Sequence, residues 1–159
     1  MAVAAAVAAA GVLAGTAVSA TDTTVSIVGC TEAHGGNVTV PAGSTISFRL
    51  GWVARSTGLD EAFLRDITTT ATVDGTPVAD ADSYWSQPVA TTTQSGSKAY
   101  EVDWLYPTGI TLESGQSLTL TFQGELARPI TDGFQSQGGG RAPAGDLLGG
   151  HDTCTVTAA

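Results

Sequence analysis

The stretch from Tyr100 to Tyr106, YEVDWLY, decides the fold class of this chain. Its two sides differ, because apolar or aromatic residues occupy every second position and two of the three residues between them are acidic. A period of two residues predicts a β-strand that buries one face. The residues of the expected inner side are Tyr100, Val102, Trp104 and Tyr106, and those of the outer side are Glu101, Asp103 and Leu105.

The same alternation recurs along the chain. In each run one side is apolar and the other carries Thr, Ser or charge, a pattern typical of antiparallel sheets with one buried face. The expected inward residues are Val25 and Ile27; Val38 and Val40; Ile46, Phe48, Leu50 and Trp52; Ile67, Ala71 and Val73; Leu118, Leu120 and Phe122; Cys154 and Val156.

Turn residues separate these runs. Asp74-Gly75 lies between Val73 and Val78 and is the strongest hairpin signal in the sequence. Pro41 to Ser44 and Glu113 to Gln116 each precede an expected strand. The run from Leu112 to Phe122 resembles strands of many secreted sandwich modules, a generic likeness that indicates no particular function.

We therefore predict an all-β fold, a two-sheet antiparallel β-sandwich of immunoglobulin-like type with seven to eight strands. Only Leu59 to Asp66 (LDEAFLRD) is expected to form a helix, of about two turns. The segments 79–93 and 128–152 do not fit regular strands, and the second is rich in Gly and Pro and is either functional or disordered.

Residues 1–20 contain no charged side chain and end in Val18-Ser19-Ala20, small residues of the kind that signal peptidase accepts. We expect a secretory signal peptide at 1–20 and a single sandwich domain at 21–159, extracellular or attached to the cell envelope. An uncleaved apolar helix that assembles a pilin-like filament is the alternative for this segment. No stable membrane insertion of the mature domain is expected.

Two cysteines in a secreted chain predict one disulfide, Cys30 to Cys154, which would close nearly the whole domain as one loop. The two histidines flank these cysteines, so His34 and His151 would be brought together. A weak copper or zinc site at this pair is an alternative to two exposed loop histidines.

The formal net charge of −9, with six basic residues, argues against binding to nucleic acids and to anionic membranes. The sequence contains no nucleophile elbow, no zinc-protease motif and no phosphate-binding glycine loop. Glu101 and Asp103 share a strand face, as a carboxylate pair for glycoside hydrolysis would, but a solvated polar face explains them as well. We predict no enzyme activity and no cofactor.

Binding is the function class that remains. Tyr84 and Trp85 lie in an expected loop, where they would either stack on sugar rings or plug one end of the sandwich. Loop aspartates, the pair Asp80 and Asp82 and the pair Asp132 and Asp146, are calcium candidates or turn formers.

Asn37-Val38-Thr39 is a glycosylation sequon in hosts that modify asparagine. We thus expect a non-catalytic binding or structural module. Its partner would be a cell-surface protein, a polysaccharide or a second copy of the chain.

Overall fold

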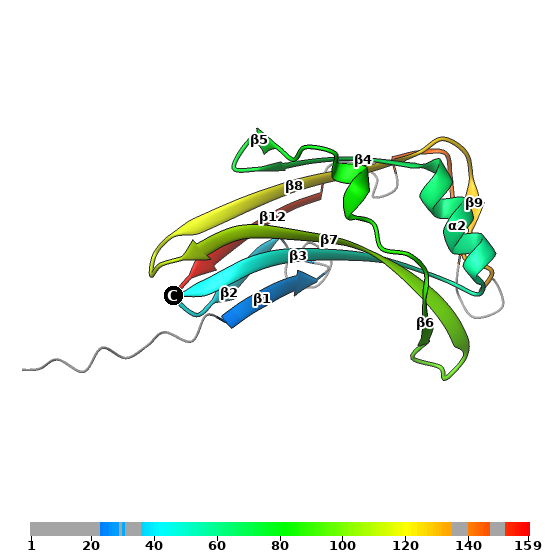
Figure 1. Ribbon diagram of the computed structural model, residues 1–159, viewed down its shortest axis with the longest axis horizontal. Helices are drawn as coiled ribbons and strands as arrows, with labels where there is room; N and C mark the ends of the chain where they lie inside the picture. Colours follow the sequence, from blue (N-terminus) through cyan, green and yellow to red (C-terminus); the bar gives the residue numbers. More distant parts are fainter. Residues whose placement is uncertain (1–22, 29, 31–35, 135–139, 147–151) are drawn as a thin grey trace, which may run out of the picture.

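The structure is a computed structural model that describes residues 23–28, 30, 36–134, 140–146 and 152–159. Its first sheet has four strands in the order β1-β3-β7-β6. These strands are β1 (Thr23–Val28), β3 (Ser44–Ala54), β7 (Lys98–Leu112) and β6 (Val89–Thr92). The long antiparallel pair of β3 and β7 forms the centre of this sheet and contains the YEVDWLY stretch (Figure 1).

The second sheet has the order β2-β12-β8-β4-β5, with β11 also paired to β8. Its strands are β2 (Asn37–Val40), β12 (Asp152–Ala158), β8 (Ser117–Leu126), β4 (Ile67–Val73), β5 (Thr76–Pro77) and β11 (Gly145–Asp146). A separate two-stranded sheet pairs β9 (Ile130–Thr131) with β10 (Arg141–Ala142). Among the described residues, eight strands have four or more residues, within the predicted range of seven to eight.

The two main sheets pack against each other through two clusters of buried apolar residues, the larger around Trp104 and the smaller around Phe63 of the helix that follows β3. Trp104 of β7 is fully buried and contacts Phe122 of β8 edge-on, with ring centroids 5.0 Å apart. The alternation read from the sequence therefore places the expected side chains inward on both sheets. The buried members of the larger cluster include Ile46, Phe48, Leu118, Leu120 and Val156.

The prediction of purely antiparallel pairing is wrong at two edges. Strand β1 pairs with β3 in parallel, and β2 pairs with β12 in parallel. The first strand thus borders one sheet and the second borders the other (Figure 1). Alternation could not reveal this, because a period of two residues is the same whichever way the neighbouring strand runs.

The predicted hairpin at Asp74-Gly75 is confirmed. Both residues have positive φ, 48° and 77°, as a two-residue turn between β4 and β5 requires. The predicted turns also precede strands, since β3 begins at Ser44 and β8 at Ser117. Strand β6, by contrast, lies within a segment that the sequence did not predict as strand, because its residues are mostly exposed on both sides.

The predicted helix is confirmed as α2 (Thr57–Asp66), which begins two residues earlier than expected. It contacts β3, β7 and β9 and lies at one end of the two sheets (Figure 1). Its Phe63 ring stacks on Trp52 of β3, with centroids 5.1 Å apart. Within the described part of the chain, no helix has the length and apolar character needed to cross a bilayer.

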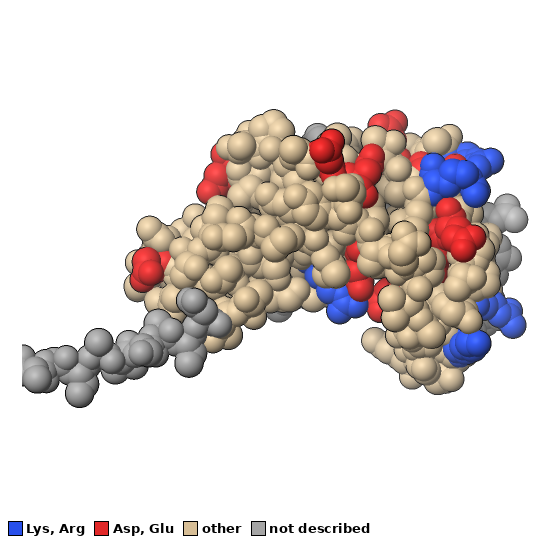
Figure 2. All heavy atoms as spheres, viewed as in Figure 1, with Lys and Arg blue, Asp and Glu red and all other residues tan. Residues whose placement is uncertain are grey.

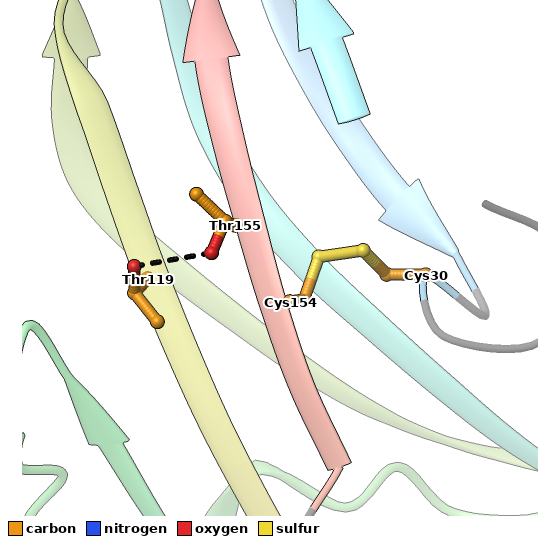
Figure 3. The surroundings of a disulfide bond; sticks show 4 residues. All are labelled: Cys30, Thr119, Cys154 and Thr155. Atoms are coloured by element: carbon orange, nitrogen blue, oxygen red, sulfur yellow. Dashed lines mark hydrogen bonds between the residues drawn. A yellow bond between two sulfur atoms is a disulfide. The ribbon is translucent and has the colours of Figure 1, made fainter. Parts of the chain in front are cut away.

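The predicted disulfide is confirmed between Cys30 and Cys154, whose Cα atoms are 5.7 Å apart (Figure 3). Cys30 follows β1 of the first sheet, and Cys154 belongs to β12 of the second. The bond therefore joins the two sheets and links residues that are 124 positions apart in the sequence. In the chain-entropy account, a loop closed over this separation stabilises the fold by up to about 5 kcal/mol.

Candidate functional site

The aromatic pair Tyr84-Trp85 lies between the two sheets. Tyr84 ends the short 3-10 helix η1 (Ala81–Tyr84), which contacts both β4 and β7. Its ring meets Tyr106 edge-on at 4.9 Å and Trp104 at 6.1 Å. Trp85 contacts Phe63 of α2 edge-on at 5.0 Å.

The indole of Trp85 is also bonded inside the protein. Its Nε1 donates a hydrogen bond of 2.8 Å to the hydroxyl of Thr69, a buried residue of β4. Both Tyr84 and Trp85 are half-buried. Their rings are thus used in packing between the sheets, the arrangement expected of a plug, and the prediction of sugar stacking stays a prediction.

The carboxylates of Glu101 and Asp103 share a face of β7, as the sequence predicted, and both are paired with Arg49 of β3. Arg49 Nε donates to Asp103 Oδ1 at 2.8 Å, and its Nη2 lies 3.2 Å from Glu101 Oε1. A Cβ at Gly51 would lie 3.1 Å from an oxygen of each carboxylate. The absence of a side chain at Gly51 therefore leaves room for this cluster.

Electrostatics confirm that the cluster is an ion pair. The hydrogen bond with Asp103 raises the pKa of the Arg49 guanidinium above its ordinary value, and the charge of Glu101 adds to this effect. Both oxygens of Asp103 accept from Arg49, at 2.8 Å each.

Two of the loop aspartates, Asp82 and Asp132, bind backbone groups through their side chains. Asp82 accepts a hydrogen bond from the backbone N–H of Thr69. Asp132 accepts from the N–H groups of Phe134 and Gly140, at 2.8 and 3.0 Å, and so holds the two ends of a loop together. This is the turn-forming use of aspartate. Across the described ranges, no group of three or more His, Cys, Asp or Glu is placed to hold a metal ion.

Several predicted features lie outside the described residues. These are the signal segment 1–20 and both histidines of the possible metal site, His34 and His151. The side chain of Asp146, at the end of β11, is also outside them. Asn37 of the sequon is described, and it is exposed at the start of β2.

A buried carboxyl group in α2 was not predicted from the sequence. Asp60, in the first turn of the helix, is 0% exposed, and neither of its carboxyl oxygens has a hydrogen-bond partner in the described structure. Burial raises its pKa to about 6, and the negative charge of Glu101 contributes to the rise. Trp52 Nε1 is likewise buried without a partner.

The outer face of the second sheet carries a regular array of polar side chains. It presents Thr72 from β4, Ser117, Thr119 and Thr121 from β8, Thr153, Thr155 and Thr157 from β12, and Asn37 and Thr39 from β2, which together we call the threonine face. The residues that alternate with them point into the core. The strand registers place the nine side chains in three rows.

These rows run straight across neighbouring strands. The first row is Thr72, Thr121 and Thr153; the second is Thr119, Thr155 and Asn37; the third is Ser117, Thr157 and Thr39. Within rows the hydroxyls face one another. Thr119 and Thr155 are 3.4 Å apart at their Oγ1 atoms (Figure 3), and Ser117 Oγ lies 3.2 Å from Thr157 Oγ1.

None of the nine side chains is charged or aromatic. Figure 2 shows most of the basic side chains toward the end of the molecule that carries α2 and β6, with one basic group near the middle, whereas the charged groups over the opposite strand ends are acidic and separated by uncharged surface. The sequence carried the signal for this face in the repeated Thr-x-Thr of its strands. Alternation alone identified those threonines only as outward residues.

Comparison of the chain with protein-family models, curated proteins and solved structures gives no match.

Proposed function

We propose that this chain is an extracytoplasmic, non-catalytic binding module with an immunoglobulin-like sandwich fold. It binds a flat, uncharged, hydroxyl-bearing surface through the threonine face. The observation that carries the proposal is the array itself, three aligned rows of neutral polar side chains on one sheet. Their β-branched threonines are restricted at χ1, so little conformational entropy is lost when a surface is bound.

The surroundings of the other candidate site residues also support a binding role for the threonine face. The carboxylate pair is held in an ion-pair cluster by Arg49, and Tyr84 and Trp85 pack within the protein. The disulfide favours an oxidising compartment, where such bonds persist. Sandwich folds commonly leave the outer faces of their sheets to solvent, where binding surfaces can form.

Export is tested by the intact mass of the protein recovered from the culture fluid of its own host. A chain that begins at Thr21 and gains the mass of two hydrogens on reduction supports secretion with the Cys30–Cys154 bond formed. A chain that retains residues 1–20, or a large assembly, would contradict the proposal. It would favour the filament alternative instead.

Binding through the threonine face is tested by retention of the full chain on three neutral solids: microcrystalline cellulose, chitin and ice. Thr155→Tyr places a bulky ring in the middle row. Tyrosine is chosen because it is a residue type that β-strands accept well. The matched control is Thr111→Tyr. Thr111 is in a cross-strand threonine pair on the first sheet, where its Oγ1 is 2.8 Å from that of Thr45.

We expect the wild-type protein and Thr111→Tyr to be retained on at least one of the three solids, and Thr155→Tyr to be lost. Retention should change little between low and high salt, because no charged side chain belongs to the face. Absence of retention on all three solids would refute the proposal. So would equal retention of the two tyrosine variants.

A further inference from the structure

We infer that the surface bound by the threonine face is ice. The inference rests on the proposed function and names the class of surface. It starts from the composition of the face, which combines hydroxyl groups and methyl groups on one side of the sheet. Hydroxyls can join a network of hydrogen-bonded water, and the threonine methyls pack against it without competing for hydrogen bonds.

The spacing of the array is the second argument. Neighbouring strands lie about 4.8 Å apart, and alternate residues of one strand are separated by roughly 6.8 Å, twice the rise per residue. The threonine face therefore repeats in two directions at right angles, at distances of the size at which oxygen atoms repeat on the faces of hexagonal ice. Sheet twist rotates adjacent strands by roughly 20°. The described rows span three strands, so the twist accumulated across a row stays limited.

The absence of other groups from the face is the third argument. Sugar-binding surfaces rely on aromatic rings, which stack on the apolar faces of the sugar, and the threonine face contains none. Charged groups would attract anionic polymers or hold their own hydration shells, and the nine residues have no charge. Two carboxylates lie at the border of the face. Asp74, in the β4–β5 turn, accepts a hydrogen bond of 2.8 Å from the backbone N–H of Thr119. Glu125 of β8 is opposite Thr68, two rungs beyond the first row.

Rigidity is the fourth argument. Five of the threonines, at positions 72, 119, 121, 155 and 157, are half-buried by their neighbours. Thr119 and Thr155, and Ser117 and Thr157, already contact each other through their hydroxyls. An ordered array needs little rearrangement to meet an ordered surface.

The test is incorporation of the full chain into slowly grown polycrystalline ice, measured against an inert protein of similar size in the same solution. We expect enrichment of the wild-type protein in the ice and a loss of that enrichment in Thr155→Tyr. Thr111→Tyr should be incorporated like the wild type. The wild type and Thr111→Tyr should also slow the coarsening of fine ice crystals, and Thr155→Tyr should not.

A second variant guards against misfolding of the first. Thr153→Lys places a charge at an exposed position of the first row, which a strand tolerates. It should lose ice incorporation while keeping the circular dichroism spectrum and melting temperature of the wild type.

The inference is overturned if the wild type enters ice no more than the inert protein, or if folded Thr155→Tyr and Thr153→Lys enter it as the wild type does. Retention on cellulose or chitin that Thr155→Tyr abolishes, without incorporation into ice, would overturn ice as the ligand. The proposed function would then stand.

Discussion

The buried carboxyl group of Asp60 makes the stability of the fold depend on pH in an unusual direction. Its pKa rises from 3.8, the value expected in the unfolded chain, to about 6 in the folded protein. A raised acid pKa means that the folded state binds more protons, so stability falls as pH rises from about 4 to about 6 and is constant above that. The difference of about 2 pKa units corresponds to about 3 kcal/mol lost at neutral pH.

Asp60→Asn removes the charge and keeps the shape of the side chain. We expect the variant to be more stable than the wild type by about 3 kcal/mol at pH 7, and the two to converge near pH 4. The assay is urea unfolding at several pH values between 4 and 8, with the disulfide intact. Glu61→Gln is the control, because Glu61 is the next residue of the same helix and is exposed.

The reasoning would be refuted by a difference between Asp60→Asn and the wild type that stays constant from pH 4 to pH 7. It would also be refuted if Glu61→Gln showed an equally large, pH-dependent increase in the free energy of unfolding. In either case the carboxyl of Asp60 would not be the group whose burial opposes folding at neutral pH.

Three further predictions concern the stability of the fold, each measured by urea unfolding. Replacing both Cys30 and Cys154 by Ala should cost up to about 5 kcal/mol, and no loss would contradict the closed-loop account. Replacing Gly by Ala inside a strand normally raises the free energy of unfolding by roughly 0.5–1 kcal/mol. Gly51→Ala should not raise it, because the new Cβ would crowd the two carboxylates held by Arg49. An increase of that size in the free energy of unfolding would show that the two carboxylates move aside at little cost. Thr69→Val should cost about 1–3 kcal/mol, because it leaves the indole N–H of Trp85 without its partner, and an unchanged midpoint would speak against that hydrogen bond.

Much of the fold could be predicted because its strands bury one face. The inward positions of Val102, Trp104 and Phe122 follow from alternation alone, and all three are buried. The Asp74-Gly75 turn follows from residue type, which is local chemistry. The disulfide was predicted because the chain has only two cysteines and was expected to be secreted.

Strand direction, by contrast, depends on contacts between distant segments. The parallel pairing of β1 with β3 could not be predicted from periodicity. Strand β6 was missed because it lies at the edge of its sheet and buries little on either side.

The site residues divide in the same way. The shared face of Glu101 and Asp103 was predictable from their spacing, but their pairing with Arg49 needed the register of β3 on β7. The burial of Asp60 was hidden because an acidic residue in the first turn of a helix normally faces water and the helix dipole. The threonines were visible in the sequence, but their alignment into rows needed the register of four strands.

The most direct measurement of the central claim is the retention of the two tyrosine variants on the same solids, with both shown to be folded. Thr155→Tyr and Thr111→Tyr introduce the same ring into a cross-strand threonine pair, one on the second sheet and one on the first. The account predicts loss of binding for Thr155→Tyr alone. Binding that survives Thr155→Tyr, or that is lost equally in both variants, would contradict the assignment of the threonine face as the binding surface.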